Sequence, residues 1–547
     1  MVKRTWIALV VLALGIAALA AAPGGIVPGP APMPAGGIVP NVEMARQNAE
    51  AEAANYLAEA QGRLGLGDEN LTFLPRSTDV DPFGASHVRF AQFYRGIPVF
   101  GQEVIAHVNN AVGGVFALTT RVEAVPDLDV TPSFGAHQAV RMAKEQFRAL
   151  RGPGKASAQA ELFIYPNCSG YDLAYVVRVS NVMQDNLTPA EHVFVIDARS
   201  GATIADWDDL HTAKPAPIVV SYTIPKTAPG NSYYSGDITI GTAQASDGTA
   251  KYAMKDLVRG GGYTIDMLNK TTGGTLFTNT TNVWGNNTLG DRATIGVDGH
   301  YGMQATWDFY KLNYGRNGIY NDGVGAYSRV HYGRSYNNAF WSSSCKCMTY
   351  GDGDGSVFSP LTSLDVAAHE MSHGVTAATS ALVYSGESGG LNESFSDIIA
   401  CGVEFWAAAN GASTVPDYWI GEDIYTPSTP GDALRYMDTP KRDGRSIDHY
   451  SLYTSSTDVH YSSGIWNNMF YLLAAGGTNQ TSGISVTGIG IDKALAICYL
   501  ANTGYFDPSE TFAMARQDCI AAATQLYGAS STEVTRVGQA WTAVGVN

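Results

Sequence analysis

The pentapeptide His369-Glu370-Met371-Ser372-His373 constrains this 547-residue chain more than any other feature. Side chains four residues apart lie on one face of an α-helix, so both imidazoles could bind one metal ion while Glu370 lies beside the water on that ion. The segment therefore predicts a helix, within a helical stretch from Leu361 to Ser380, and a zinc site. Alone, the short pattern HExxH is also compatible with ordinary surface or core histidines, so the prediction depends on further ligands.

A catalytic zinc site needs a third protein ligand and an open fourth position for water. Glu393 is the candidate, because nineteen residues separate it from His373 and it stands at the head of the next predicted helix. Asp397, one helical turn further, could accept the remaining ring N–H of a ligand histidine. A third histidine in the pattern HExxHxxGxxH is excluded, since Thr376 and Thr379 occupy its last two fixed positions.

The chain is acidic, with 34 Lys and Arg against 50 Asp and Glu and a formal net charge of −16 at pH 7. A face that binds nucleic acid needs a surplus of basic side chains, so nucleic acid is not expected as a partner. With 45% hydrophobic and 15% charged residues the composition excludes a disordered chain, and the length predicts several domains.

The N-terminus is typical of an exported protein. Lys3 and Arg4 precede an apolar run from Trp6 to about Ala22, which ends in small residues that include Ala18-Leu19-Ala20. This pattern predicts a secretory signal peptide over residues 1–22, with an uncleaved signal anchor as the alternative. We therefore expect a secreted, extracellular protein that is not held in a membrane once the signal peptide is removed.

Changes in composition divide the rest of the chain. Residues 23–41 are rich in Pro, Gly and Ala and are expected to form an unstructured linker. Residues 42–213 predict two small α+β modules, about 42–125 and 126–213, because helical runs there alternate with strand-like runs. A β-rich region, 214–360, then precedes an α-helical region, 361–547. The helices expected in the last region are Leu361 to Ser380, Glu393 to Asn410, Gly464 to Ala475, Asp492 to Leu500, Pro508 to Tyr527 and Thr532 to Val544.

Six cysteines are too few for a disulfide scaffold in a chain of this length. Cys498 and Cys519 fall in two successive predicted helices and could form a disulfide or remain two buried thiols. Cys345 and Cys347 could form a local pair. The sequence does not decide between these alternatives.

The segment from His369 to Asp397 resembles the zinc-binding block of the thermolysin family of metalloendopeptidases in spacing and residue type. The similarity extends from about residue 220 to 547 through shorter motifs, such as Asn337 to Trp341 and Gly421 to Thr426. The short form Asp458-Val459-His460 is more like the pseudolysin and vibriolysin branch. Upstream, Arg89 to Gly101 is similar to the propeptides that precede such enzymes.

The resemblance implies an α+β fold. A catalytic domain of two lobes, one β-rich and one α-helical, would hold a zinc cleft between them and follow a small α+β propeptide. The zinc ligands would be His369, His373 and Glu393, with Asp397 behind them, and the catalytic groups would be Glu370, Tyr384, His460 and Asp458. Glu370 would take a proton from water and deliver it to the leaving amine. Tyr384 and His460 would donate hydrogen bonds to the oxyanion, and Asp458 would orient His460.

Substrate-binding positions are implied in the same way. Arg435 would bind a substrate carbonyl, while Asn338 and the backbone of Ala339 would hold the extended peptide as an added strand. The pocket on the primed side would be lined by Phe358, Leu361, Val366, Ile420 and Leu434. All five are apolar, which predicts cleavage before bulky apolar residues such as Leu or Phe, although an ordinary core would contain the same residue types.

Calcium is implied as a second metal, since acidic and carbonyl oxygens suit a hard cation that takes six to eight oxygen ligands. The main cluster would consist of Asp365, Glu404, Asp417 and Glu422, with the carbonyl of Trp419. A further loop site would consist of Tyr425, Thr426, Thr429 and Asp432. Taken singly, such acidic residues are also typical of a solvated surface.

Three hypotheses follow. The first is a secreted, monomeric zinc endopeptidase that acts on proteins and peptides. Its residues 23 to about 213 would assist folding, block the cleft and be removed by self-cleavage between about 211 and 222. The second is a non-catalytic, calcium-stabilised binding protein on the same scaffold, which predicts loss of Glu370, Tyr384 or His460, yet all three are present. The third is a zinc exopeptidase, which would place the third ligand where Asn392 stands. The sequence favours the first hypothesis.

Overall fold

The structure is a computed structural model that describes residues 25–28, 41–62, 67–120, 122, 125–167, 170–181, 190–209, 221–343 and 345–547. The predicted signal peptide lies outside these residues. So do most of the predicted linker and all but the last two residues of the predicted self-cleavage segment, 211–222.

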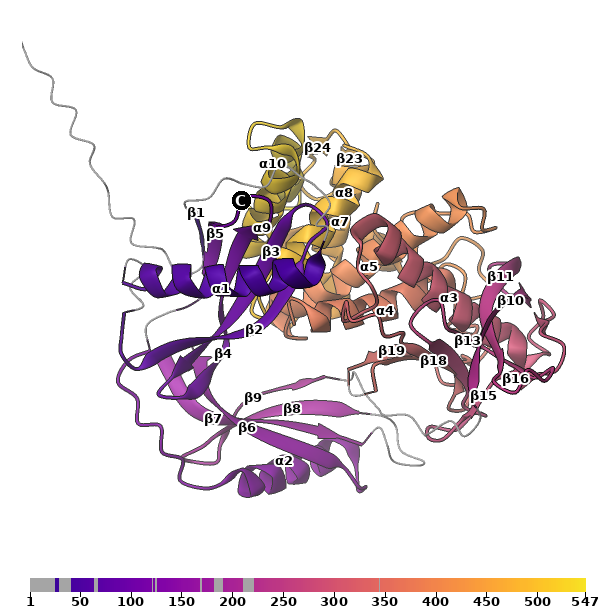
Figure 1. The fold of residues 1–547 in the computed structure, drawn as a ribbon, viewed down its shortest axis with the longest axis horizontal. Helices are drawn as coiled ribbons and strands as arrows, with labels where there is room; N and C mark the ends of the chain where they lie inside the picture. The colour runs from indigo at the N-terminus through magenta and orange to yellow at the C-terminus, as the bar shows by residue number, and fades with distance from the viewer. Residues whose placement is uncertain are drawn as a thin grey trace, which may run out of the picture.

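The N-terminal region consists of two α+β modules, each with one helix packed on a sheet (Figure 1). Helix α1 (Val42–Ala60) buries a row of alanines and Leu57 against the first sheet. Helix α2 (Ala136–Arg151) buries Phe147 against the second sheet. The elements of the two modules end at Thr120 and begin at Ala136, on either side of the expected boundary near residue 125. The strands are β2 (Leu71–Val80), β3 (Ala85–Tyr94), β4 (Ile97–Asn109), β5 (Val115–Thr120), β6 (Ser157–Asn167), β7 (Gly170–Ser180), β8 (Glu191–Asp197) and β9 (Thr203–Asp208).

A four-residue strand lies within the predicted linker. Gly25–Pro28 form β1, which pairs antiparallel with β5. The expectation of an unstructured segment is wrong at these residues. The edge of β5 has backbone N–H and C=O groups that β1 pairs with.

The β-rich region begins with two sheets built mostly from short strands. In the larger one the order is β13-β14-β18-β20-β19, so β19 is an edge strand. Strands β14, β18 and β20 are parallel, and β19 pairs antiparallel with β20. The strands are β10 (Tyr222–Asn231), β11 (Asp237–Ala245), β12 (Tyr252–Ala253), β13 (Lys255–Asp256), β14 (Gly262–Asp266), β15 (Thr275–Leu276), β16 (Thr278–Asn279), β17 (Trp284–Gly285), β18 (Tyr327–Tyr332), β19 (Ala339–Ser342) and β20 (Cys347–Gly351).

A long helix, α3 (Arg292–Tyr314), lies in this region where only strand-like runs are expected from the sequence. The helix is buried on nearly every side, so it shows no apolar stripe of helical period. Its glycines allow close packing: a Cβ on Gly302 would lie 2.3 Å from the Cβ of Ala367 on the zinc-motif helix. The absence of a stripe thus reflects burial, and the helix is not identified from the sequence, which predicts this region only as β-rich.

The C-terminal region is helical, as expected. Observed helices overlap all six predicted ones, so the α+β fold with a β-rich and a helical part is confirmed. The helices are α4 (Leu364–Ala378), α5 (Gly386–Ala409), α6 (Val459–Ser462), α7 (Gly464–Ala474), α8 (Ile491–Leu500), α9 (Phe512–Tyr527) and α10 (Thr532–Ala543). Shorter elements are β21 (Trp419–Ile420), β22 (Arg435–Tyr436), β23 (Gly477–Thr478), β24 (Ser485–Val486), the 3₁₀ turns Pro440–Asp443 and Tyr450–Leu452, and a π-helical turn, Ala501–Tyr505.

Helix α5 begins at Gly386, seven residues before the predicted start, so Glu393 lies two turns inside it. The Gly389-Gly390 pair does not break the helix. A Cβ at Gly389 would lie 2.4 Å from Val459, and one at Gly390 would lie 2.4 Å from Ser462. These glycines therefore let helix α6 approach α5 closely. Because glycine has low helix propensity, the sequence pattern predicts a helix that starts only after this pair.

The N-terminal region packs against the helical part through strands β3 and β4 (Figure 1). Arg89 is buried and donates hydrogen bonds to the carbonyls of Phe506 at 2.8 Å and Thr503 at 3.2 Å. The ring of His107 stacks on Tyr505 with a centroid separation of 4.4 Å. This contact involves side chains that are almost fully buried, so the two regions form one packed unit.

Cys345 and Cys347 form a disulfide. Cys498 and Cys519 are free, buried thiols, as is Cys401, so the alternative of a bond between the two helices is not observed. In the part of the chain that the structure describes, no helix is both long and apolar enough to cross a membrane.

Candidate active site

Two adjacent helices bring the motif residues together. His369, Glu370 and His373 lie on α4, and Glu393 lies on α5. The Nε2 atoms of the two histidines are 3.0 Å apart. Glu393 places its carboxylate oxygens 3.5 Å from Nε2 of His369 and 3.3 Å from Nε2 of His373. The spacing of four residues on α4 thus directs both rings to one point, and α5 contributes the carboxylate of Glu393 to the same point.

The chemistry of these donors fits a zinc ion. Among the described residues, His369, His373 and Glu393 are the only set of three or more His, Cys, Asp or Glu whose ligand atoms all lie within 4.8 Å of one another. Burial lowers the pKa of His373, but the hydrogen bond to Glu393 and its charge outweigh this and raise the pKa to about 9. Glu393 Oε2 is buried and accepts no hydrogen bond from the described residues. The pocket therefore favours positive charge at the point where the three side chains meet.

Each histidine has a polar partner on its other ring nitrogen. His369 Nδ1 lies 2.8 Å from Asp397 Oδ1, as the sequence predicts. His373 Nδ1 lies 2.7 Å from Asn392 Oδ1, a partner that the sequence analysis missed. Asn392 directly precedes Glu393 on α5. Its contact with His373 depends on how α4 and α5 pack, so the sequence alone does not show it. Such partners fix the ring orientation and tautomer of a ligand histidine.

Asp397 is fully buried and also binds Arg435. The guanidinium donates two hydrogen bonds to this carboxylate, of 2.7 Å from Nε and 2.6 Å from Nη2. Burial raises the pKa of Asp397, but the charge of Arg435 and the contact with His369 outweigh it and hold the pKa well below its ordinary value. Asp397 is therefore an anion that connects a predicted metal ligand to a predicted substrate-binding residue.

Tyr384 and His460 lie beside the same point. The Tyr384 hydroxyl donates a hydrogen bond to Glu393, and it lies 3.2 Å from His460 Nε2. Asp458 caps helix α6 by accepting from the His460 backbone N–H at 2.9 Å, and its Oδ1 lies 2.8 Å from His460 Nδ1. The cap therefore also holds the imidazole of His460 with Nε2 directed toward the cleft.

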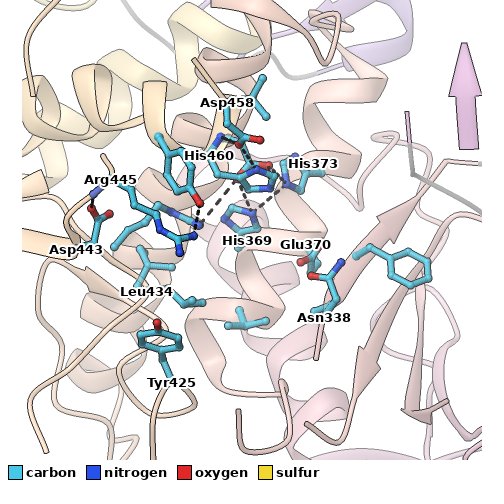
Figure 2. Close-up of a pocket in the computed structure, with 18 of the residues that line it drawn as sticks. Asn338, His369, Glu370, His373, Tyr425, Leu434, Asp443, Arg445, Asp458 and His460 are labelled. Atoms are coloured by element: carbon cyan, nitrogen blue, oxygen red, sulfur yellow. Dashed lines mark hydrogen bonds and ion pairs between the residues drawn. The ribbon is translucent and has the colours of Figure 1, made fainter. Parts of the chain in front are cut away.

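A cleft of about 880 Å³ contains these groups (Figure 2). Glu370 lies beside Asn338 on one side of the histidines, while Asp443 and Arg445, which the sequence analysis did not single out, lie on the other side (Figure 2). Burial raises the pKa of Glu370, against the lowering effect of the two histidines. All eight predicted substrate-binding residues line this cleft: Asn338, Ala339, Phe358, Leu361, Val366, Ile420, Leu434 and Arg435.

Strand β19 borders the cleft with one edge. Ala339 pairs with Tyr350 of β20 on one side, and β19 is the last strand of its sheet. An edge strand has backbone N–H and C=O groups that an extended peptide can pair with. Asp208, near the end of the N-terminal region, lines the same cleft. The N-terminal region therefore reaches the space that a substrate would occupy.

The predicted calcium residues of the main cluster lie close enough to affect one another electrostatically, with Asp365 on α4 and Glu404 on α5. Asp365 and Glu404 are buried, and the Oε2 atoms of Glu404 and Glu422 accept no hydrogen bond from the described residues. Burial and the charge of Asp365 raise the pKa of Glu422 to about 10 and raise that of Glu404 well above its ordinary value. Asp417 is at the edge of the cluster and accepts a hydrogen bond from the Trp419 N–H at 2.6 Å. Several carboxylates thus repel one another at close range.

The second predicted calcium loop is folded on itself. Thr426 donates to Asp432 at 2.8 Å, Tyr436 donates to its other oxygen at 2.9 Å, and the Thr429 N–H donates to the Thr426 carbonyl at 2.7 Å. Tyr425 lines the cleft next to this turn. Both oxygens of Asp432 therefore have protein donors, whereas Oε2 of Glu404 and Oε2 of Glu422 in the main cluster have none among the described residues.

Family comparisons agree with this geometry. The family described as "Thermolysin metallopeptidase, catalytic domain" matches residues 227–377, and "Thermolysin metallopeptidase, alpha-helical domain" matches residues 380–546. The "Fungalysin/Thermolysin Propeptide Motif" matches residues 72–112. The matched ranges contain, in turn, the two histidines, the Glu393 ligand candidate, and strands β3 and β4.

Similar proteins cover most of the chain. A transglutaminase-activating metalloprotease of Streptomyces mobaraensis is 40% identical over 502 residues, which are 89% of this chain and 63% of that protein. A bacillolysin of Bacillus cereus is 38% identical over 92% of this chain and 91% of its own length. A thermolysin of Bacillus sp. (strain EA1) is 37% identical over 90% of this chain and 89% of its own length.

Proposed function

This chain belongs to the thermolysin family of metallopeptidases, as a zinc endopeptidase made with a propeptide, and from that premise we propose how its own residues hydrolyse a peptide bond. The observation that carries the proposal is the meeting of His369, His373 and Glu393 at one point of a cleft bordered by an edge strand. Glu370, Tyr384 and His460 line the same cleft.

His369, His373 and Glu393 would hold the zinc ion, and Asp397 and Asn392 would keep the two rings in orientation. When bound, zinc supplies a Lewis acid that lowers the pKa of a water and polarises a carbonyl. With three protein ligands, a bound zinc ion would keep one position for water, as a catalytic rather than a structural site requires.

Glu370 is the proposed proton carrier. It follows His369 on α4, lines the cleft and is 6% exposed, so a carboxylate is present where the attacking water would lie. It would take a proton from that water and give it to the nitrogen of the leaving amine. The pKa of Glu370, raised by burial, favours this exchange because a base of higher pKa accepts a proton more readily.

Tyr384 and His460 are the proposed donors to the oxyanion that forms from the scissile carbonyl. Their polar atoms lie 3.2 Å apart, so a single oxygen in the cleft that faces both atoms could accept a hydrogen bond from each. Asp458 would keep His460 in position through the contact at 2.8 Å.

The substrate would bind as a strand beside β19. Asn338 and the backbone of Ala339 would pair with the peptide, and Arg435, held by Asp397, would bind a carbonyl on the primed side. The apolar wall of the cleft favours a bulky apolar side chain directly after the scissile bond. That wall consists of Phe358, Leu361, Val366, Ile420 and Leu434.

Calcium is proposed for the main acidic cluster of Asp365, Glu404, Asp417 and Glu422, with the Trp419 carbonyl. The buried Oε2 atoms of Glu404 and Glu422, which accept no hydrogen bond from the described residues, support this proposal, because a cation would relieve the repulsion between the two carboxylates. The loop of Tyr425, Thr426, Thr429 and Asp432 is proposed as a second, weaker site, since a cation there would have to replace the hydrogen bonds to Asp432.

Secretion and processing complete the proposal. Residues 1–22 would direct export, and residues 23 to about 213 would act as intramolecular chaperone and inhibitor until self-cleavage between about 211 and 222. The position of Asp208 in the cleft and the buried contacts of Arg89 with the helical lobe support inhibition by the N-terminal region. The mature enzyme would be a monomer that acts on proteins and peptides.

Products of casein digestion test this function. The mature protein should release internal fragments whose N-terminal residues are mostly Leu, Phe and similar apolar residues, because the primed-side pocket binds that side chain. Mass spectrometry of the fragments measures the cleavage positions. Release of single amino acids from the chain ends would instead indicate an exopeptidase, and intact casein would indicate a binding protein.

Arg89→Ala should weaken the contact between the propeptide and the catalytic domain. Arg89 pairs with Glu103 and is nearly fully buried, so its loss leaves a buried carboxylate with only Arg76, at 3.3 Å, as counter-charge. We expect the full chain to lose about 3 kcal/mol of stability and the yield of mature enzyme to fall. Thermal unfolding of the full chain and secreted activity measure the two effects. Arg95→Ala is the control, because Arg95 is 38% exposed and pairs with exposed Asp127, and an equal loss there would contradict the assignment.

A further inference from the structure

Asn467 lies on helix α7, which packs against α5, the helix of Glu393 and Asp397 (Figure 1). Its side chain is 1% exposed. The amide nitrogen donates a hydrogen bond to Asp397 Oδ2 at 2.8 Å, and the amide oxygen accepts one from the Ser394 hydroxyl at 2.7 Å. Because an ionised carboxylate only accepts hydrogen bonds, the amide presents its N–H₂ to Asp397, and the Ser394 hydroxyl donates to the amide oxygen.

Asp397 is the residue through which Asn467 can act. Its Oδ1 lies 2.8 Å from His369 Nδ1 and accepts from Arg435 Nη2 at 2.6 Å. Its Oδ2 accepts from Arg435 Nε at 2.7 Å and from Asn467. One buried carboxylate therefore sets the orientation of a zinc ligand and of the arginine that would bind substrate. Any rotation of the Asp397 carboxylate moves both contacts at once.

Besides the contact with His369 on α4, the contact from Asn467 ties this carboxylate to a further helix, α7. Asp397 and Ser394 belong to α5, and Arg435 belongs to the two-residue strand β22. Asn467 adds a donor from α7, whose neighbours Ile465, Trp466 and Met469 are fully buried in the main core. A donor on a packed helix loses little further side-chain freedom, so it holds its acceptor firmly.

We infer that Asn467 is a positioning residue for the hydrolytic site: through Asp397 it orients His369 for zinc and Arg435 for the substrate carbonyl. This inference rests on the proposed roles of His369 and Arg435. Asn467 itself would touch neither the metal nor the substrate. A neutral amide suits the position, since it donates to the carboxylate without adding a charge to a buried site that already contains Asp397 and Glu393.

Asn467→Ala and Asn467→Leu test the inference. We expect the zinc dissociation constant to rise about tenfold in both, the lower end of the effect of losing a partner that supports a metal ligand. Leucine has the same number of side-chain heavy atoms as asparagine, branched at the same carbon, so it leaves no cavity that could explain its effect. In the mature enzyme KM for a peptide should rise about threefold to tenfold, and kcat should change by less than about twofold, because Arg435 binds substrate and Glu370 is untouched.

Zinc affinity is measured by competition with a chromophoric chelator in the full chain that carries Glu370→Ala, so the readout does not need activity or maturation. Asn468→Ala is the matched control. Asn468 is the next residue of the same helix, is 2% exposed, and donates to the Met437 carbonyl at 2.9 Å. Its loss should lower thermal stability and leave zinc affinity within about twofold.

Ser394→Ala provides a second variant in case the changes at Asn467 prevent folding. Losing the hydroxyl leaves the amide free to turn, and we expect a twofold to threefold rise in the zinc dissociation constant. The inference is overturned if the Asn467 variants, or Ser394→Ala where these do not fold, change zinc affinity no more than Asn468→Ala does. A parent chain that binds no zinc would overturn the proposed function, and this inference with it.

Discussion

Glu370→Ala should lower kcat by roughly two to four orders of magnitude while zinc content and fold stay unchanged. Glu370 follows His369 on α4 and lines the cleft, but it is not one of the three proposed ligands. Its loss therefore removes the proposed proton carrier and keeps the proposed ligands. The same loss should stall removal of the propeptide, because cleavage of the precursor would use the same machinery. Casein hydrolysis, metal analysis and the size of the secreted chain measure these three results.

Glu370→Gln is the matched variant. Glutamine keeps the shape of the side chain and cannot take up a proton at neutral pH, so it should be as inactive as alanine. Its melting temperature should stay within a few degrees of that of the parent full chain, since the change removes a buried charge and creates no cavity. If this variant matured and digested casein at the normal rate, another group would have to carry the proton.

Removing zinc with a zinc-selective chelator should lower peptide hydrolysis by at least about three orders of magnitude, because the metal supplies several kcal/mol of transition-state stabilisation. Stoichiometric zinc should restore the rate, and calcium should not. A peptide assay of the mature enzyme before and after dialysis measures the effect. The ligand set of His369, His373 and Glu393 predicts that zinc returns in a ratio of one ion to one chain.

A calcium-selective chelator separates the two metals. It should leave the initial rate nearly unchanged at room temperature and lower the melting temperature by several degrees. The reason is that a cation held at one hundred times its dissociation constant contributes about 2.7 kcal/mol, and without it Glu404 and Glu422 repel each other. If calcium removal changed neither the rate nor the melting temperature, calcium would contribute to neither catalysis nor stability. The acidic cluster would then be an ordinary polar patch.

Part of the fold could be predicted because its signals are local. The six C-terminal helices follow apolar patterns of helical period, and all six are observed. Helix α3 could not be found this way, since it is buried on nearly every side and its glycines serve close packing with α4. The early start of α5 was missed for the same reason, because Gly389 and Gly390 are there to admit Val459 and Ser462.

The site divides in a similar way. His369, Glu370 and His373 are recognisable from spacing alone, since a helix converts a separation of four residues into a shared face. Tyr384 and His460 come from separate elements, and only their resemblance to family motifs pointed to them. Asn392 and Asn467 carry no motif that the sequence analysis used, and they are identified only by their distances to His373 and Asp397.

The amino-acid sequence by itself determined the type of chemistry to expect: a helix with two histidines four residues apart, a third candidate ligand at a suitable separation, and a β-rich followed by a helical region. These properties depend on the order of neighbouring residues, which the helix period translates directly into geometry. The tertiary structure alone decided which groups support the ligands, how the N-terminal region reaches the cleft with Asp208, and that the cysteines of α8 and α9 stay free. Such contacts join segments tens to hundreds of residues apart, and their geometry depends on how whole helices and sheets pack.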